Sequence, residues 1–187
     1  VLAIAMGIYR DGVMLALERS ALAAAYPVPG RRLCVFIHGL AFDEHCWQPA
    51  GAGEIDFASG VQADFGYTPL YLRYNTGLPI AENGTRLAIL LEELLAAWPE
   101  PVAELLLIGH SMGGLIARAA CEAGTTGDLH WPQVTTMLVC LGSPHLGSPV
   151  ERLGETVTTA LHLHEITAPL AKSGAARSQG IKDLRHG

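Results

Sequence analysis

The residues best suited to chemistry lie where an apolar run meets a helical pattern. Residues 104–120 read ELLLIGHSMGGLIARAA, and Ser111 lies two positions from a glycine on either side, Gly109 and Gly113. A strand that reverses tightly into a helix strains the residue at the corner, and only small neighbours fit around it. The G-x-S-x-G pattern between an expected strand and an expected helix predicts a serine nucleophile raised clear of a sheet. The alternative is a serine that only caps the helix.

A nucleophile of this kind needs N–H groups that bind the oxyanion of a tetrahedral intermediate. Met112 follows the serine at an expected helix N-terminus, where unpaired N–H groups and the helix dipole favour negative charge. We expect the second N–H from Leu40, because Gly39 lets the chain turn after an apolar run so that this group points inward. The expected catalytic residues are Ser111, Leu40 and Met112. The expected substrate-binding residues are His38, Gly39 and His110.

Strands and helices alternate around these residues. Short apolar runs predict strands over residues 33–37, 68–74, 104–108 and 134–141. Apolar residues at three- and four-residue spacing predict helices over residues 84–98 and 114–123. This alternation predicts an α/β fold with three α/β/α layers and a parallel sheet, whose ligands bind at the carboxyl ends of the strands.

A single domain is expected, because 187 residues suffice for one sizeable core. We expect an amphipathic helix over residues 1–26, a core over 31–149 and a lid-like or tail segment over 150–187. Charged residues interrupt the apolar N-terminus well short of the ~20 residues that span a membrane. No transmembrane segment is therefore expected. The absence of a basic secretory start favours the cytoplasm, although the compartment is not determined.

Composition excludes several classes of function. The net charge is −6 and no Lys/Arg cluster stands beside aromatic residues, so nucleic acid is not an expected partner. The four cysteines share no metal-binding spacing and are expected to be free thiols. We expect no metal or organic cofactor. Asn83 begins a glycosylation sequon, but we expect it to cap the helix over 84–98.

Several segments resemble a known group of proteins. GHSMGG, CVFIHGL and CLGSPHLGSP together resemble the α/β-hydrolase superfamily of esterases and lipases, and more narrowly its branch similar to GPI inositol deacylases and triacylglycerol lipases. YTPLYLRYNTGLPIAENGTRLAILLEELLAAWP and SQGIKDLRHG resemble bacterial members of that branch. The resemblance implies a triad in which the serine comes first, an acid follows a later strand and a histidine lies near the C-terminus. It places the nucleophile on Ser111 and the oxyanion donors on Leu40 and Met112.

The chain departs from this pattern at the acid and the histidine. His145 follows an expected strand at the correct end of the sheet, but its family counterpart resembles part of a structural turn. His130, beside Asp128, precedes that strand and is expected at the wrong end. The remaining candidates are His162 and His164, which cannot both face one site, and Asp183 with His186, which are close together in a polar tail. We therefore expect the triad acid and base to be missing and the domain to be C-terminally incomplete.

The predicted function is hydrolysis of small-molecule or lipid carboxylic esters through an acyl-enzyme on Ser111, as in carboxylesterases and lipases. Two alternatives remain. One is a catalytically silent binding or scaffold module on a hydrolase fold, and the other is an acyltransferase that uses the same nucleophile. If the strand over 134–141 is the last, its edge is open to another chain. We then expect self-association or a complementing fragment, and a monodisperse monomer in light scattering would contradict this.

Overall fold

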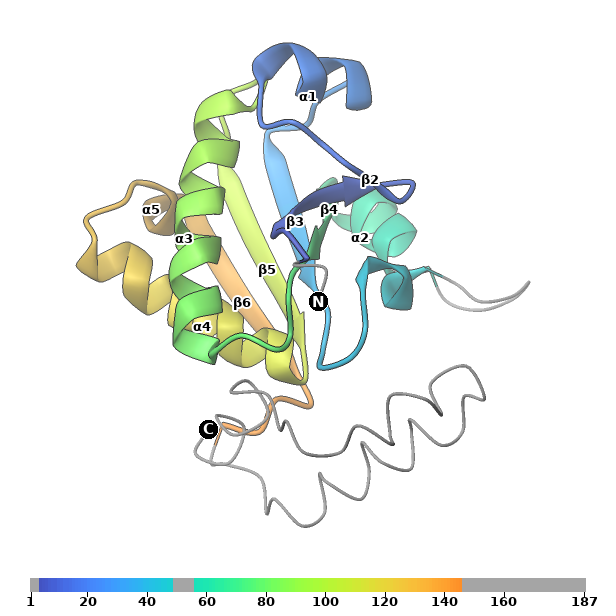
Figure 1. Ribbon diagram of the computed structural model, residues 1–187. Coiled ribbons are helices and arrows are strands. Elements are labelled where there is room, and N and C mark those ends of the chain that lie inside the picture. Colours follow the sequence, from blue (N-terminus) through green and yellow to red (C-terminus); the bar gives the residue numbers. More distant parts are fainter. Residues whose placement is uncertain (1–3, 49–55, 146–187) are drawn as a thin grey trace.

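The computed structural model describes residues 4–48 and 56–145. Within these ranges the chain forms a six-stranded sheet in the order β2-β1-β4-β3-β5-β6 (Figure 1). The strands are β1 (Gly7–Arg10), β2 (Val13–Met14), β3 (Arg32–Ile37), β4 (Thr68–Arg73), β5 (Glu104–His110) and β6 (Thr135–Leu141). The helices are α1 (Arg19–Ala25), α2 (Phe57–Phe65), α3 (Ile80–Ala97), α4 (Met112–Thr126) and α5 (Trp131–Val134), with a 3-10 helix η1 (Glu44–Trp47).

The centre of the sheet is parallel, as the apolar runs predict. β3 pairs in parallel with β4 on one side and β5 on the other, and β5 pairs in parallel with β6. Strands covered on both faces read as continuous apolar runs rather than alternating ones, and residues 33–37 of β3 are fully buried. The carboxyl ends of β3, β5 and β6 therefore meet at one edge of the sheet.

The prediction of a helix over residues 1–26 is wrong for residues 7–14. These residues form β1 and β2, which pair antiparallel, and β1 also pairs antiparallel with β4. Asp11 and Gly12 have φ of 51° and 76°, which is the conformation of a tight hairpin turn. This Asp-Gly signal outweighs the helical spacing, and the α-helix is confined to α1. The sheet is consequently mixed, with an antiparallel pair at one end.

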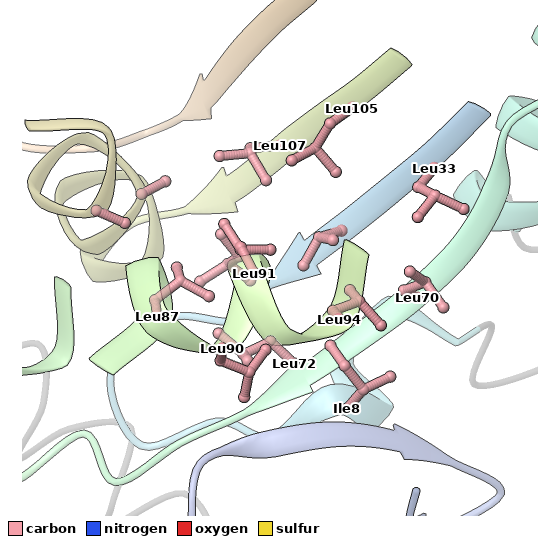
Figure 2. Packing of buried hydrophobic residues seen from close by; sticks show 14 of the residues in the cluster. Ile8, Leu33, Leu70, Leu72, Leu87, Leu90, Leu91, Leu94, Leu105 and Leu107 are labelled. Carbon is pink, nitrogen blue, oxygen red and sulfur yellow. The ribbon is translucent and has the colours of Figure 1, made fainter. Parts of the chain in front are cut away.

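Two hydrophobic clusters lie on opposite faces of the sheet. The larger cluster packs α3 and α4 against the sheet, and Figure 2 shows the α3 leucines opposite side chains of four strands. The labelled members from α3 are Leu87, Leu90, Leu91 and Leu94. The smaller cluster lies under η1 and α2, with Trp47 and Ala58 packed against the sheet. β3 contributes Leu33, Val35 and Ile37 to the first cluster and Cys34 and Phe36 to the second. This alternation produces the three predicted layers.

Asn83 does not cap α3. The helix begins one turn earlier than predicted, with Pro79 at the N-cap, and Asn83 lies inside it and is fully buried. Its amide nitrogen donates to the carbonyl oxygens of Asn75 at 3.0 Å and Leu78 at 3.4 Å. In the folded chain this asparagine is therefore inaccessible to glycosylation.

β6 ends the sheet on the side away from the hairpin, and no other strand of the described residues pairs with its outer edge. Met137 and Leu141 on this strand are 58% and 40% exposed. Pairing of this edge with a second copy or a fragment stays a prediction. No described helix is both long enough and apolar enough to cross a membrane. All four cysteines are free.

Two glycines inside helices should respond oppositely to substitution by alanine. A Cβ atom at Gly84 would lie 2.5 Å from the Cβ of Ala119, because α3 and α4 approach closely there, whereas one at Gly60 in α2 meets nothing within 4 Å. We expect Gly84→Ala to lower the free energy of unfolding by about 1–3 kcal/mol. Gly60→Ala should raise it by about 0.5–1 kcal/mol. Urea unfolding measures both, and a Gly84→Ala variant as stable as the wild type, or more stable, would contradict the close approach.

Candidate active site

Ser111 occupies a strained corner between β5 and α4. Its φ of 52° and ψ of −120° lie where non-glycine residues are uncommon. The surroundings hold it there, since its N–H donates to the carbonyl oxygen of Leu141 at 2.8 Å and its own carbonyl accepts from Gly114 N at 3.2 Å. The side chain makes no capping hydrogen bond to α4, which excludes the simple N-cap role. The corner predicted from the glycine spacing is present.

The glycines around Ser111 are required by contact between backbones. A Cβ atom at Gly109 would lie 2.5 Å from the Cα of Gly114 across the reversal. One at Gly113 would lie 2.3 Å from the carbonyl oxygen of Ile37, at the end of β3. The start of α4 therefore packs directly against both neighbouring strand ends.

The turn after β3 passes beside the serine. A Cβ atom at Gly39 would lie 3.2 Å from the Cβ of Ser111 and 3.0 Å from His110 Nδ1. Within the described residues no acceptor is found for the N–H of Leu40, the next residue of this turn. Met112 is the first residue of α4, where helix geometry provides no intrahelical acceptor for its N–H. The structure thus brings the turn with the first predicted donor next to the corner with the second.

His38 lies behind this turn rather than in an open site. Its ring is fully buried and stacks on Tyr74 with a centroid distance of 4.3 Å. The hydroxyl of Tyr74 donates to the His38 carbonyl oxygen at 2.7 Å, and the backbone N–H of Tyr74 donates to His38 Nε2 at 3.4 Å. This pairing leaves the proton on Nδ1, which donates to the carbonyl oxygen of Gly39 at 2.9 Å. The imidazole faces the interior, and burial lowers the pKa of His38. A substrate contact by His38 stays a prediction.

His110 stands exposed among aromatic residues beside Ser111. Its ring meets Phe42 edge-on at 6.3 Å and Trp47 at 6.4 Å. Phe42 is 57% exposed on the turn after β3, whereas Trp47 is buried beneath it. Phe42 was not recognised from the sequence, because a single aromatic residue in a turn carries no periodic signal. A substrate contact by His110 stays a prediction.

The described histidines that follow the serine are engaged elsewhere. His145 Nδ1 accepts from Arg118 at 2.8 Å, and His130 Nδ1 lies 2.8 Å from Glu92 Oε1 near the amino end of β6. In the part of the chain that the structure describes, the Ser111 hydroxyl has no hydrogen-bond partner. The remaining sequence candidates lie outside the described residues: His162, His164, Asp183 and His186.

One cluster of side chains has the composition of a metal site. Ligand atoms of Asp43, Glu44 and His45 lie within 4.8 Å of one another. Both Glu44 oxygens, however, accept hydrogen bonds from Arg73, and Asp43 Oδ1 accepts from the N–H of His45 at 3.0 Å. These ligand atoms therefore serve the protein fold, and the arrangement does not favour a cation.

The strain at Ser111 predicts an unusual order of stability among variants without the hydroxyl. Alanine keeps the unfavourable φ of 52°, whereas glycine adopts it freely. We expect Ser111→Gly to be more stable than Ser111→Ala by about 1–2 kcal/mol, despite the greater chain entropy of glycine. Urea unfolding of the two variants measures the difference, and an equally stable or more stable alanine variant would exclude stored strain.

The buried His38 predicts a pH dependence of stability. Because desolvation lowers its pKa below the ordinary 6.5, the unfolded chain binds a proton more readily than the folded chain. The stability that the neutral ring contributes is complete above pH 6.5 and is lost as pH falls through the folded pKa. The unfolding free energies of the wild type and His38→Asn should therefore differ most at pH 8 and converge towards pH 5. A difference in unfolding free energy between the two proteins that stays the same from pH 8 to pH 5 would contradict the prediction.

Known proteins show the same architecture. A model of the PGAP1-like alpha/beta domain family matches residues 87–182, just over half of the chain. The chain is similar to the Bacillus licheniformis lipase BlEst2 in its propeptide form, with 19% sequence identity, a TM-score of 0.58 and coverage of 83% of this chain and 30% of that chain. For the mature form of BlEst2 the identity is 19%, the TM-score 0.53 and the coverage 85% and 56%. The chain thus spans less than two thirds of either lipase chain. No curated protein matches it.

The structural likeness confirms the α/β-hydrolase fold predicted from the sequence. The family match includes the end of β5, the serine corner and α4. By this match the chain belongs to the PGAP1-like alpha/beta domain family.

Proposed function

We propose that this chain supplies the nucleophile and oxyanion hole of a serine hydrolase that cleaves carboxylic esters. Ser111 Oγ attacks the ester carbonyl carbon and gives its proton to a base, which passes it to the departing alcohol. The carbonyl oxygen becomes an oxyanion held by the N–H groups of Leu40 and Met112. Water then attacks the acyl-enzyme, releases the carboxylic acid and returns the proton to Ser111.

The observation that carries this proposal is the meeting of three features at one strained corner. Ser111 has a positive φ and its hydroxyl makes no capping bond. The turn that carries the Leu40 N–H, which has no acceptor among the described residues, passes within side-chain contact of it. A helix N-terminus directly behind the serine adds favourable partial charges for an anion. Backbone strain of this type is held by the surrounding structure and occurs preferentially at active sites.

The comparisons support the reaction class without specifying a substrate. The similar structures are described as those of a lipase, and the shared fold places ligands at the carboxyl ends of parallel strands. Ser111 lies at that edge. Among the described residues no histidine bonds to Ser111, so the proposed mechanism requires a base from outside them.

The nucleophile is tested on the intact protein with a fluorophosphonate probe and with hydrolysis of p-nitrophenyl esters. We expect a covalent adduct on Ser111 and an esterase rate that Ser111→Ala lowers by about 10³-fold or more, because the nucleophile is removed. Ser143→Ala is the matched control, since this second serine follows the neighbouring strand β6, and it should keep its labelling.

The outcomes separate the three functions that the sequence left open. Labelling with ester hydrolysis supports the hydrolase. Transfer of the acyl group to an added alcohol in preference to water would identify an acyltransferase. An intact protein that binds acyl ligands but is neither labelled nor active would be a silent binding module and would contradict the proposal.

A further inference from the structure

We propose that Glu44 and Arg73 are positioning residues, and that their ion pair holds the turn with the Leu40 N–H against the corner at Ser111. This inference rests on the proposed function, because the turn is assigned to the oxyanion hole there. The pair lies at one end of that turn, which runs from His38 to η1. Nothing in the sequence pattern singles out either residue.

The turn needs support from outside itself. Ala41 has a φ of 61°, a conformation that side chains with a Cβ atom rarely adopt. The backbone hydrogen bond within this part of the turn, from Phe42 N to Gly39 O, is long at 3.3 Å. A strained segment with weak internal bonding keeps one geometry only if its ends are fixed.

Two consecutive residues at the carboxyl end of β4, Arg73 and Tyr74, fix both ends of the turn. Tyr74 holds the first end through its stacking and hydrogen bonds with His38. Arg73 holds the second end, where its Nε donates to Glu44 Oε2 at 2.5 Å and its Nη2 donates to Glu44 Oε1. The Glu44 side chain is only 2% exposed, whereas the Arg73 side chain is 25% exposed, so solvent reaches the pair from the arginine side only.

Arg73 is itself anchored. It is the last residue of β4 and pairs in register with Gly7 of β1, and its guanidinium lies 4.1 Å from the ring centroid of Tyr9. The Glu44 hydrogen bond raises the pKa of Arg73, which keeps the guanidinium charged. The pair therefore connects the turn to the rigid sheet rather than to another mobile side chain.

The ion pair contributes more to the position of the turn than to the stability of the fold. Burying the Glu44 carboxylate carries a desolvation penalty that the attraction of Arg73 largely offsets, so the net stabilisation by the pair is small. A two-pronged arginine–carboxylate contact does, however, fix both distance and orientation. An oxyanion donor is sensitive to both, because misplacement by about 1 Å lowers rates by about 100-fold.

Glu44→Gln tests the inference by ester kinetics in the intact protein. The amide places an N–H group against the arginine fork, so the turn loses its fixed end. We expect kcat to fall by about 10- to 100-fold with KM changed less than about 3-fold, as for loss of an interaction made in the transition state. Arg73→Lys keeps the charge without the fork, so it should cause a smaller fall in kcat.

A second ion pair of the same sheet provides a matched control. Glu104 Oε2 accepts from Arg32 Nε at 3.1 Å and from Arg32 Nη2 at 2.9 Å, at the amino ends of β3 and β5. This pair lies at the opposite edge of the sheet from Ser111. Glu104→Gln should therefore leave kcat and KM within about 2-fold of the wild type, because it weakens a more exposed arginine–carboxylate pair away from the turn.

Hydrogen–deuterium exchange gives a measurement that does not depend on activity. In Glu44→Gln the amides of residues 39–43 should exchange about 10-fold faster than in the wild type, whereas Glu104→Gln and Ser111→Ala should not change them. If Glu44→Gln does not fold, as judged by near-UV circular dichroism, Arg73→Lys provides both measurements.

The two failures are distinguishable. An unlabelled, inactive wild type overturns the proposed hydrolase, and exchange in Glu44→Gln then decides alone whether the pair holds the turn. A folded Glu44→Gln variant with wild-type kcat, or with wild-type exchange at residues 39–43, overturns the positioning role.

Discussion

The site depends on one crowded reversal of the backbone. β5 ends and α4 begins on either side of Ser111, and the glycines at 109 and 114 approach so closely that no Cβ atom fits between them. A chain reversing in this space has a single residue in which to turn, and the φ of 52° at Ser111 is the result. In that conformation the hydroxyl makes no capping bond to the helix, and the Met112 N–H lies in the first turn, where no intrahelical acceptor is available. The proposed nucleophile and one of the two proposed oxyanion donors thus arise from the same constraint.

The sheet makes this constraint rigid. β3 and β5 are paired in parallel through Ile37 and Gly109, so the turn after β3 and the serine corner emerge side by side. Side chains of β3 alternate between two hydrophobic clusters, which fixes the register of the strand from both faces. Close packing of α3 on α4 at Gly84 holds the helix that follows the serine. A site built on such elements is positioned more accurately than one built on loops alone.

The two halves of the proposed oxyanion hole are held in the fold by different contacts. The family match begins at Leu87 and includes the serine corner, but the turn after β3 lies outside it. That turn is held by residues at the end of β4, which stack on His38 and form the ion pair with Glu44. His38, Tyr74 and Glu44 are buried and Arg73 is partly exposed. Because these groups bond to one another, their contribution is a defined geometry more than net stability.

The sequence by itself determined the parallel core, the serine corner and the apolar face of α3. Each is encoded by neighbouring residues, through continuous apolar runs, glycine spacing and helical periodicity. Only the tertiary structure decided that Asn83 lies inside α3 and that His38 faces Tyr74. It also decided that Glu44 meets Arg73. The His38–Tyr74 and Glu44–Arg73 contacts join residues 36 and 29 positions apart, and they exist because β3 and β4 pair in one particular register. No local pattern specifies that register, because it follows from how the whole sheet is buried on both faces.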